Sequence, residues 1–162
     1  MVGCTQPIAV RGLRPEYPEA LWDSFSAKVP FVKVDSLRPT LRWESFPRPQ
    51  DHELDREGLL ERIRNVTYDL KIWQADEEYP VEYPWQLVYL RRGVPEPSHK
   101  IESPLKPSTK YFWAIRARFE LDGQPRVTEW GVTGVRVLPF PAVASLPVVP
   151  NPLHYRFQTP SE

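Results

Sequence analysis

Hydrophobic and polar residues alternate along three segments of the chain, 37–44, 66–73 and 111–120. A period of two places one face of each segment on a core and the other toward solvent, so each is predicted to be a half-buried β-strand. The dipeptide Asp122-Gly123 follows the third segment and is favoured in two-residue hairpin turns. The pattern therefore predicts an all-β domain.

Shorter β-strands are expected at 85–90, 99–102 and 132–137. The segment between the first two long strands, 46–65, instead carries acidic residues followed by apolar residues at helical spacing, which predicts a short amphipathic helix with acids at its N-terminus. The acidic spacing also suggests a calcium loop. That interpretation is rejected, because Arg56 occupies the position that must hold glycine.

Four aromatic residues stand in motifs with a recognisable order. Trp43 ends the segment Pro-Thr-Leu-Arg-Trp, Tyr68 begins an alternating strand, Tyr111 ends a Leu-x-Pro-x-Thr-x-Tyr pattern, and Trp130 follows the hairpin. In order and spacing these motifs resemble strands B, C, F and G of the fibronectin type III family. The resemblance implies a single immunoglobulin-like β-sandwich in which Trp43, Tyr68 and Trp130 are structural and the hydroxyl of Tyr111 bonds to nearby backbone, forming a tyrosine corner.

The chain is predicted to have three parts: an N-terminal lead over 1–28, the fibronectin type III-like sandwich over 29–138, and a proline-rich tail over 139–162. The termini are expected to be extended. The apolar first half of the tail is expected to pack along the sandwich, with docking on a partner's groove or sheet edge as the alternative. The residues from Gln158 onward are expected to be loose.

Composition narrows the class of protein. The chain has 20 prolines in 162 residues, which excludes an α-helical bundle because proline removes a backbone donor and clashes within a helix. Lysine plus arginine equals aspartate plus glutamate at 21 each, so no overall positive field favours nucleic acid as a partner.

The single cysteine, Cys4, follows Val2 and Gly3. This resembles the end of a bacterial lipoprotein signal, in which an aliphatic and a small residue precede the cysteine that receives the lipid. The resemblance implies a protein of the bacterial periplasm, anchored through Cys4 to a membrane, with Thr5 favouring the outer membrane. The alternative is that Cys4 is an ordinary exposed thiol.

Aromatic residues at polar positions are the candidate binding surface. Trp73 and Phe112 break the alternation of their strands and should point away from the core, side by side if their strands are antiparallel neighbours. Together with Trp85 they could stack on a glycan ring or contact a hydrophobic peptide. The alternative is that the lead or the tail covers them.

A second cluster combines Arg116, Arg118 and Trp130. Arginines on the outer face of one strand, opposite a tryptophan on the next, predict a stacked cation–π ladder with a structural role.

No sequence motif of an enzyme, phosphate loop or metal site is found, so the chain is predicted to be non-catalytic, without cofactor or metal. The favoured function is an extracytoplasmic interaction module that binds another envelope protein or acts as a spacer. The alternative is a carbohydrate-binding accessory module that uses the exposed aromatics.

Overall fold

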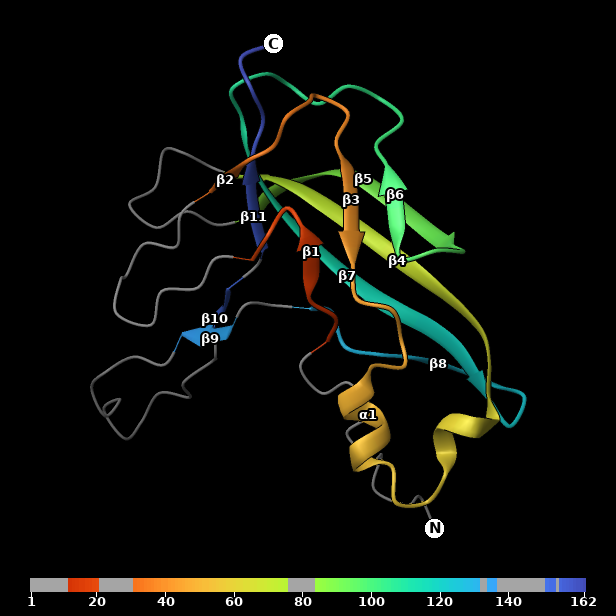
Figure 1. Ribbon diagram of the computed structural model, residues 1–162. Helices are drawn as coiled ribbons and strands as arrows, with labels where there is room; N and C mark the ends of the chain where they lie inside the picture. Colours follow the sequence, from red (N-terminus) through yellow and green to blue (C-terminus); the bar gives the residue numbers. More distant parts are fainter. Residues whose placement is uncertain (1–11, 21–30, 76–83, 132–133, 137–150, 154) are drawn as a thin grey trace.

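A computed structural model describes residues 12–20, 31–75, 84–131, 134–136, 151–153 and 155–162. Its strands form a three-stranded and a six-stranded sheet that pack against each other, the smaller sheet lying in front in Figure 1. The predicted all-β sandwich with a short helical insertion is confirmed.

The smaller sheet has the order β1-β3-β6. It consists of β1 (Pro15–Tyr17), β3 (Thr40–Trp43) and β6 (Ser98–Lys100), and β3 is antiparallel to both neighbours. The alternation predicted for β3 is present, since Leu41 and Trp43 are buried while Thr40 and Arg42 are exposed. One face of this sheet therefore lies on the core and the other faces solvent.

The larger sheet has the order β2-β11-β7-β4-β5, with β8 also paired to β7. Its strands are β2 (Val32–Lys33), β4 (Ile63–Ala75), β5 (Pro84–Val94), β7 (Lys110–Leu121), β8 (Gln124–Val127) and β11 (Tyr155–Gln158). The predicted hairpin joins β7 to β8, and both of its turn residues have positive φ, 51° at Asp122 and 78° at Gly123. Such angles define the turn that fits the twist of a two-residue hairpin.

Two separate segments run beside β7 on the side away from β4. After β8, the amide of Gly131 still donates to the carbonyl of Ile115, and β11 then begins with Tyr155 opposite Trp113. Gly131 has no room for a side chain, because an added Cβ would lie 2.2 Å from the carbonyl oxygen of Leu13. The position beside β7 is thus occupied first by the segment that ends at Gly131 and then by β11, which begins at Tyr155.

Both flanking segments contribute to the sheets. β1 comes from the predicted lead and β11 from the predicted tail. The expectation that residues from Gln158 onward are loose is wrong: Gln158 pairs with Lys33 and Lys110, and Thr159 is buried. The Thr159 hydroxyl donates to the carbonyl of Lys106 at 2.6 Å, which fixes the end of the chain to the loop before β7.

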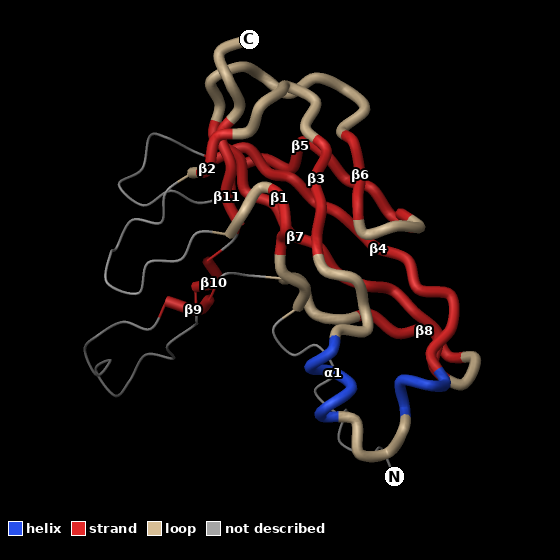
Figure 2. The backbone as a smooth tube through the Cα atoms, viewed as in Figure 1, coloured by secondary structure: helices blue, strands red, loops and turns tan. Residues whose placement is uncertain are grey.

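The insertion between β3 and β4 forms helix α1 (Pro49–Leu54) and a 3₁₀ helix (Leu59–Arg62), at the lower end of Figure 2. A buried ion pair holds α1 on the sandwich: Arg48 Nη2 lies 3.0 Å from Asp51 Oδ1, and Arg48 Nη1 donates to the carbonyl of Gly12 at 2.8 Å. The carboxylate of Asp55 accepts hydrogen bonds from the amides of Leu59 and Leu60 and so caps the second helix.

A separate antiparallel pair consists of β9 (Gly134–Arg136) and β10 (Asn151–Leu153). The core between the two main sheets is built from aromatic and aliphatic side chains of both: Leu41, Trp43, Tyr68, Leu70, Ile72, Tyr111, Trp113, Ile115, Tyr155 and Phe157. The hydroxyl of Tyr111 accepts a hydrogen bond from the amide of Lys106 at 3.0 Å, which is the contact expected of a tyrosine corner.

Candidate functional site: the outer face and free edge of the larger sheet

A buried carboxylate lies on the outer face of the larger sheet. Asp69 on β4 has no exposed surface, and its Oδ2 accepts hydrogen bonds from Arg116 Nε at 2.8 Å and from Arg118 Nη2 at 3.0 Å. The amide of Gly93 on β5 donates to its other oxygen at 3.3 Å. Burial raises the pKa of Asp69, but the bonds from Arg118, Arg116 and Gly93 outweigh it and hold the pKa below its ordinary value.

Trp130 lies beside this cluster and carries two cations on its ring. Lys71 Nζ is 4.3 Å and the Arg116 guanidinium carbon 4.5 Å from the ring centroid. The predicted stacking of Arg116 on Trp130 is therefore present. Arg118 differs from the prediction, because its guanidinium binds Asp69 instead. These contacts link β4, β7 and the segment after β8.

Trp73 and Phe112 are direct partners in the pairing of β4 with β7, as the predicted antiparallel arrangement requires. Their predicted exposure is wrong for Phe112, which is 1% exposed. Phe31 covers it in an edge-to-face contact with centroids 5.5 Å apart, and the guanidinium of Arg156 lies 5.2 Å from the Phe112 ring. Phe31, just before β2, and Arg156, within β11, thus cover Phe112. Trp73 is half-buried.

An apolar edge was not identified from the sequence. β5 ends the larger sheet, and no strand in the described ranges pairs with its second edge. Leu87, Val88 and Leu90 on this strand are 46%, 39% and 40% exposed. We refer to these three residues as the edge patch. Leu87 is the register partner of Trp73, so the half-buried tryptophan adjoins the patch.

The sequence does contain a pattern that indicates exposed apolar residues on this strand. Residues 87–90 are four consecutive apolar residues, Leu-Val-Tyr-Leu, so alternation cannot place all of them on the core. Tyr89 points back toward the smaller sheet, where its hydroxyl lies 2.6 Å from Nε2 of His99. Two of the remaining predicted site residues lie outside the described part of the structure, namely Cys4 and the side chain of Trp85.

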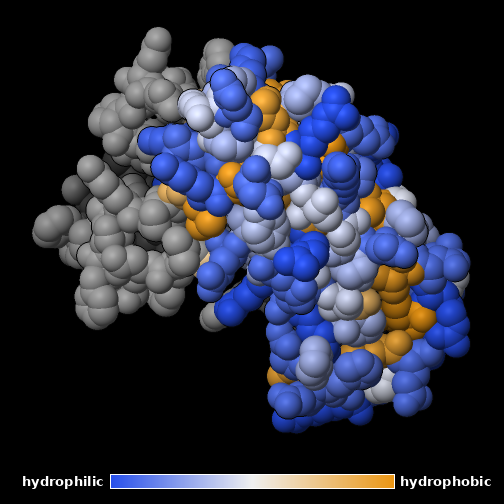
Figure 3. All heavy atoms as spheres, turned by 45° about the horizontal axis from the view of Figure 1, so that its top comes forward, coloured by the Kyte–Doolittle hydropathy of each residue, from blue (hydrophilic) through white to orange (hydrophobic). Residues whose placement is uncertain are grey.

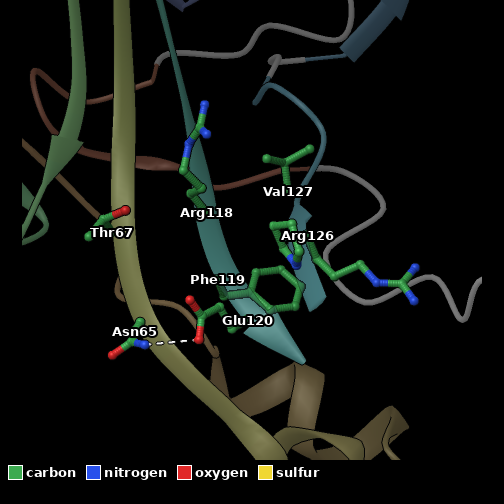
Figure 4. A pocket seen from close by; sticks show the side chains of 8 residues that line it. Asn65, Thr67, Arg118, Phe119, Glu120, Arg126 and Val127 are labelled. Atoms are coloured by element: carbon green, nitrogen blue, oxygen red, sulfur yellow. Dashed lines mark hydrogen bonds between the residues drawn. The ribbon is translucent and has the colours of Figure 1, made fainter. Parts of the chain in front are cut away.

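A hollow of about 240 Å³ opens at the far end of this sheet, between β4, β7 and β8. Figure 4 shows its polar side chains, and the Asn65 side-chain amide donates to Glu120 Oε2 at 2.9 Å. Glu120 is the one carboxylate among its lining residues, which are Asn65, Thr67, Arg118, Phe119, Glu120, Pro125, Arg126 and Val127. The lining therefore offers no pair of groups suited to acid–base exchange.

The residues described also contain no group of three histidine, cysteine or acidic side chains placed to hold a metal ion. No helix in the described ranges has the length and apolar character needed to cross a membrane.

Comparison of the chain with protein-family models, with curated proteins and with solved structures gave no match.

Proposed function

We propose that this chain is a non-catalytic interaction module with a fibronectin type III-like architecture. The strand order supports the likeness, because β3 neighbours β6 in one sheet while β4 and β7 are central in the other. The hydrogen bond between Lys106 and Tyr111 at the start of β7 supports it further.

The observation that carries the function is the edge patch, which lies beside the edge of β5 that no strand in the described ranges pairs with. An exposed edge presents a row of free backbone donors and acceptors, and apolar side chains beside them favour pairing with another strand. The proposed occupant is a short extended segment of another envelope protein. It would add as a further strand and cover Leu87, Val88 and Leu90.

Two features define that segment. The pairing of β5 with β4 is regular from Tyr89 to Arg91 and shifts register on both sides, at Val88 and between Arg91 and Val94. Such bulges twist an edge and limit how far pairing can extend, which favours a short strand over indefinite sheet growth. Arg92 is exposed and forms no ion pair within the described ranges, so acidic side chains at the end of the segment near Arg92 would complement it.

The proposed location is the bacterial envelope, with a lipid anchor at Cys4 and the outer membrane as the expected membrane. The Val-Gly-Cys sequence supports this part of the proposal. Mass spectrometry of the N-terminal peptide from the native protein tests it: an acylated Cys4 at the N-terminus is expected. An unmodified Cys4 preceded by other residues would overturn the location and leave the edge proposal standing.

The glycan alternative has weaker support. It needed Trp73 and Phe112 as a shared stacking platform, and Phe112 is buried under Phe31 and Arg156.

Photo-crosslinking from two matched positions tests the edge proposal. A photoreactive residue replaces Val88 in one version of the full chain and Val127 in the other, since Val127 on β8 is also exposed, at 50%. In cells of the source organism, position 88 should give a discrete crosslink to one protein and position 127 should not. Adding Leu87→Lys and Leu90→Lys should abolish the crosslink, because charged side chains block edge pairing. Equal products from both positions, or none from position 88, would refute the proposal.

A further inference from the structure

A second hollow, of about 510 Å³, lies on the outer face of the smaller sheet, away from the edge patch. Thr40 and Arg42 of β3 form its floor, because the alternation that buries Leu41 and Trp43 turns these two side chains outward. Lys100 is the register partner of Thr40 on β6 and lines the hollow from that side.

The opposite wall combines β1 with the loop that leads from β2 into β3. Tyr17 pairs with Arg42 in register, and its hydroxyl accepts a hydrogen bond from the amide of Asp35 at 3.3 Å. Within the loop, the amide of Arg38 donates to Ser36 Oγ at 3.0 Å. These bonds place Ser36 and Arg38 beside the sheet residues, and both line the hollow.

The lining has an excess of positive charge. It contains three cations, Arg38, Arg42 and Lys100, and one carboxylate, Asp35, which leaves a local charge of +2 (3 − 1) in a chain of net charge zero. Among the described residues, none of these cations has an acidic partner at ion-pair distance, and Arg42 instead lies 5.6 Å from the Tyr17 ring centroid.

The larger sheet provides the contrast. There, Arg116 and Arg118 are both bound to the buried carboxylate of Asp69. Arg116 and Arg118 are thus paired with a carboxylate, whereas the three cations around the hollow have no acidic partner among the described residues. On the side of the molecule seen in Figure 3, the described residues are mainly hydrophilic, and the hydrophobic ones among them are confined to a few separate areas.

We propose that this hollow binds the phosphate group of a phosphate ester. Guanidinium groups present planar pairs of donors that match phosphate oxygens, and Lys100 adds a third cation. The hydroxyls of Ser36 and Thr40 supply further donors at the wall and floor. A volume of about 510 Å³ exceeds the needs of a lone phosphate and falls in the range of small-molecule sites, so the ester's organic part has room beside it.

Calorimetry and amide chemical-shift mapping on the full chain test the proposal, with glycerol 1-phosphate as the soluble probe. Binding should weaken with added salt, and the largest shifts should fall at residues 36–42 and 100. Arg42→Ala and Arg38→Ala should each weaken binding about tenfold, because each removes a charge-assisted contact. Asp35→Asn should strengthen it about threefold by removing the one repelling carboxylate.

Arg56→Ala is the matched control, since Arg56 is exposed in the loop after α1 and its removal changes net charge equally. It should leave the affinity unchanged. Equal weakening by Arg56→Ala, or wild-type binding by both arginine variants, would overturn the proposal, as would shifts confined to other surfaces.

Vesicles separate two sources of the phosphate group. Binding to phosphatidylglycerol but not phosphatidylcholine vesicles, lost in Arg42→Ala, would identify a lipid headgroup as the source. Binding of glycerol 1-phosphate without vesicle binding would identify a soluble ester. Absence of binding to both probes would overturn the proposal.

Discussion

Asp69 has no exposed surface, and its carboxylate joins three strands of the larger sheet through Arg116, Arg118 and Gly93. Asp69→Ala removes this acceptor and leaves both guanidinium groups without it. Breaking a fully buried pair by removing one partner costs about 3–5 kcal/mol. The side chains of Arg116 and Arg118 are 21% and 42% exposed, so water recovers part of their solvation. The expected loss in free energy of unfolding at pH 7 is therefore about 2–3 kcal/mol.

The same site makes a pH-dependent contribution. Because the pKa of Asp69 in the folded protein is below its ordinary value of 3.8, its contribution to stability is present above about pH 4 and is lost as pH falls through the folded pKa. The difference in unfolding free energy between wild type and Asp69→Ala should therefore shrink below about pH 4.

Urea unfolding followed by tryptophan fluorescence, from pH 7 down to pH 3, measures both effects. Arg62→Ala is the control: the ion pair of Arg62 with Asp122 is 2.7 Å long, but the two side chains are 49% and 53% exposed. Such surface pairs contribute less than about 1 kcal/mol. Equal losses in the two variants, or a difference from wild type that stays constant with pH for Asp69→Ala, would refute the reasoning.

Two further predictions concern contacts that hold the loops and helix on the sandwich. Arg48→Ala leaves the buried carboxylate of Asp51 without its guanidinium and should lower the free energy of unfolding by about 3–5 kcal/mol, measured by urea unfolding. A loss below 1 kcal/mol would mean that α1 is held by other contacts. Tyr111→Phe removes one hydrogen bond to Lys106 and should cost about 1 kcal/mol in thermal unfolding, whereas an unchanged melting temperature would argue against the tyrosine corner.

Much of the fold follows from local pattern. The strands around Trp43, Tyr68 and Tyr111 alternate because one face lies on a shared core, and the Asp122-Gly123 turn joins adjacent strands. Because these features depend on residues that are close in the sequence, they can be predicted from one sequence alone.

The positions that the sequence pattern assigned wrongly to solvent share one physical cause: each is covered by a segment that is distant in the sequence. Alternation assigns Phe112 to solvent because it registers only the core face of β7, and it contains no information on Phe31 or Arg156, which cover the other face. Thr159 lies in a polar chain end that is predicted to be loose, yet its hydroxyl donates a hydrogen bond to the loop before β7. Asp69 occupies a polar position of its strand, so the alternation predicts that it faces solvent. In the structure two arginines cover it.

The edge patch was missed for a related reason. Four apolar residues in a row are compatible with a strand buried on both faces, and only the sheet order shows that β5 lies at the edge.

The most direct test of β5 as the binding edge is hydrogen exchange on the full chain, alone and with a synthetic peptide that covers the crosslinked partner segment. The account predicts slower exchange of backbone amides in 87–92 when the peptide is bound, with exchange in β8 unchanged. Unchanged exchange in β5 together with slower exchange on another surface would contradict it.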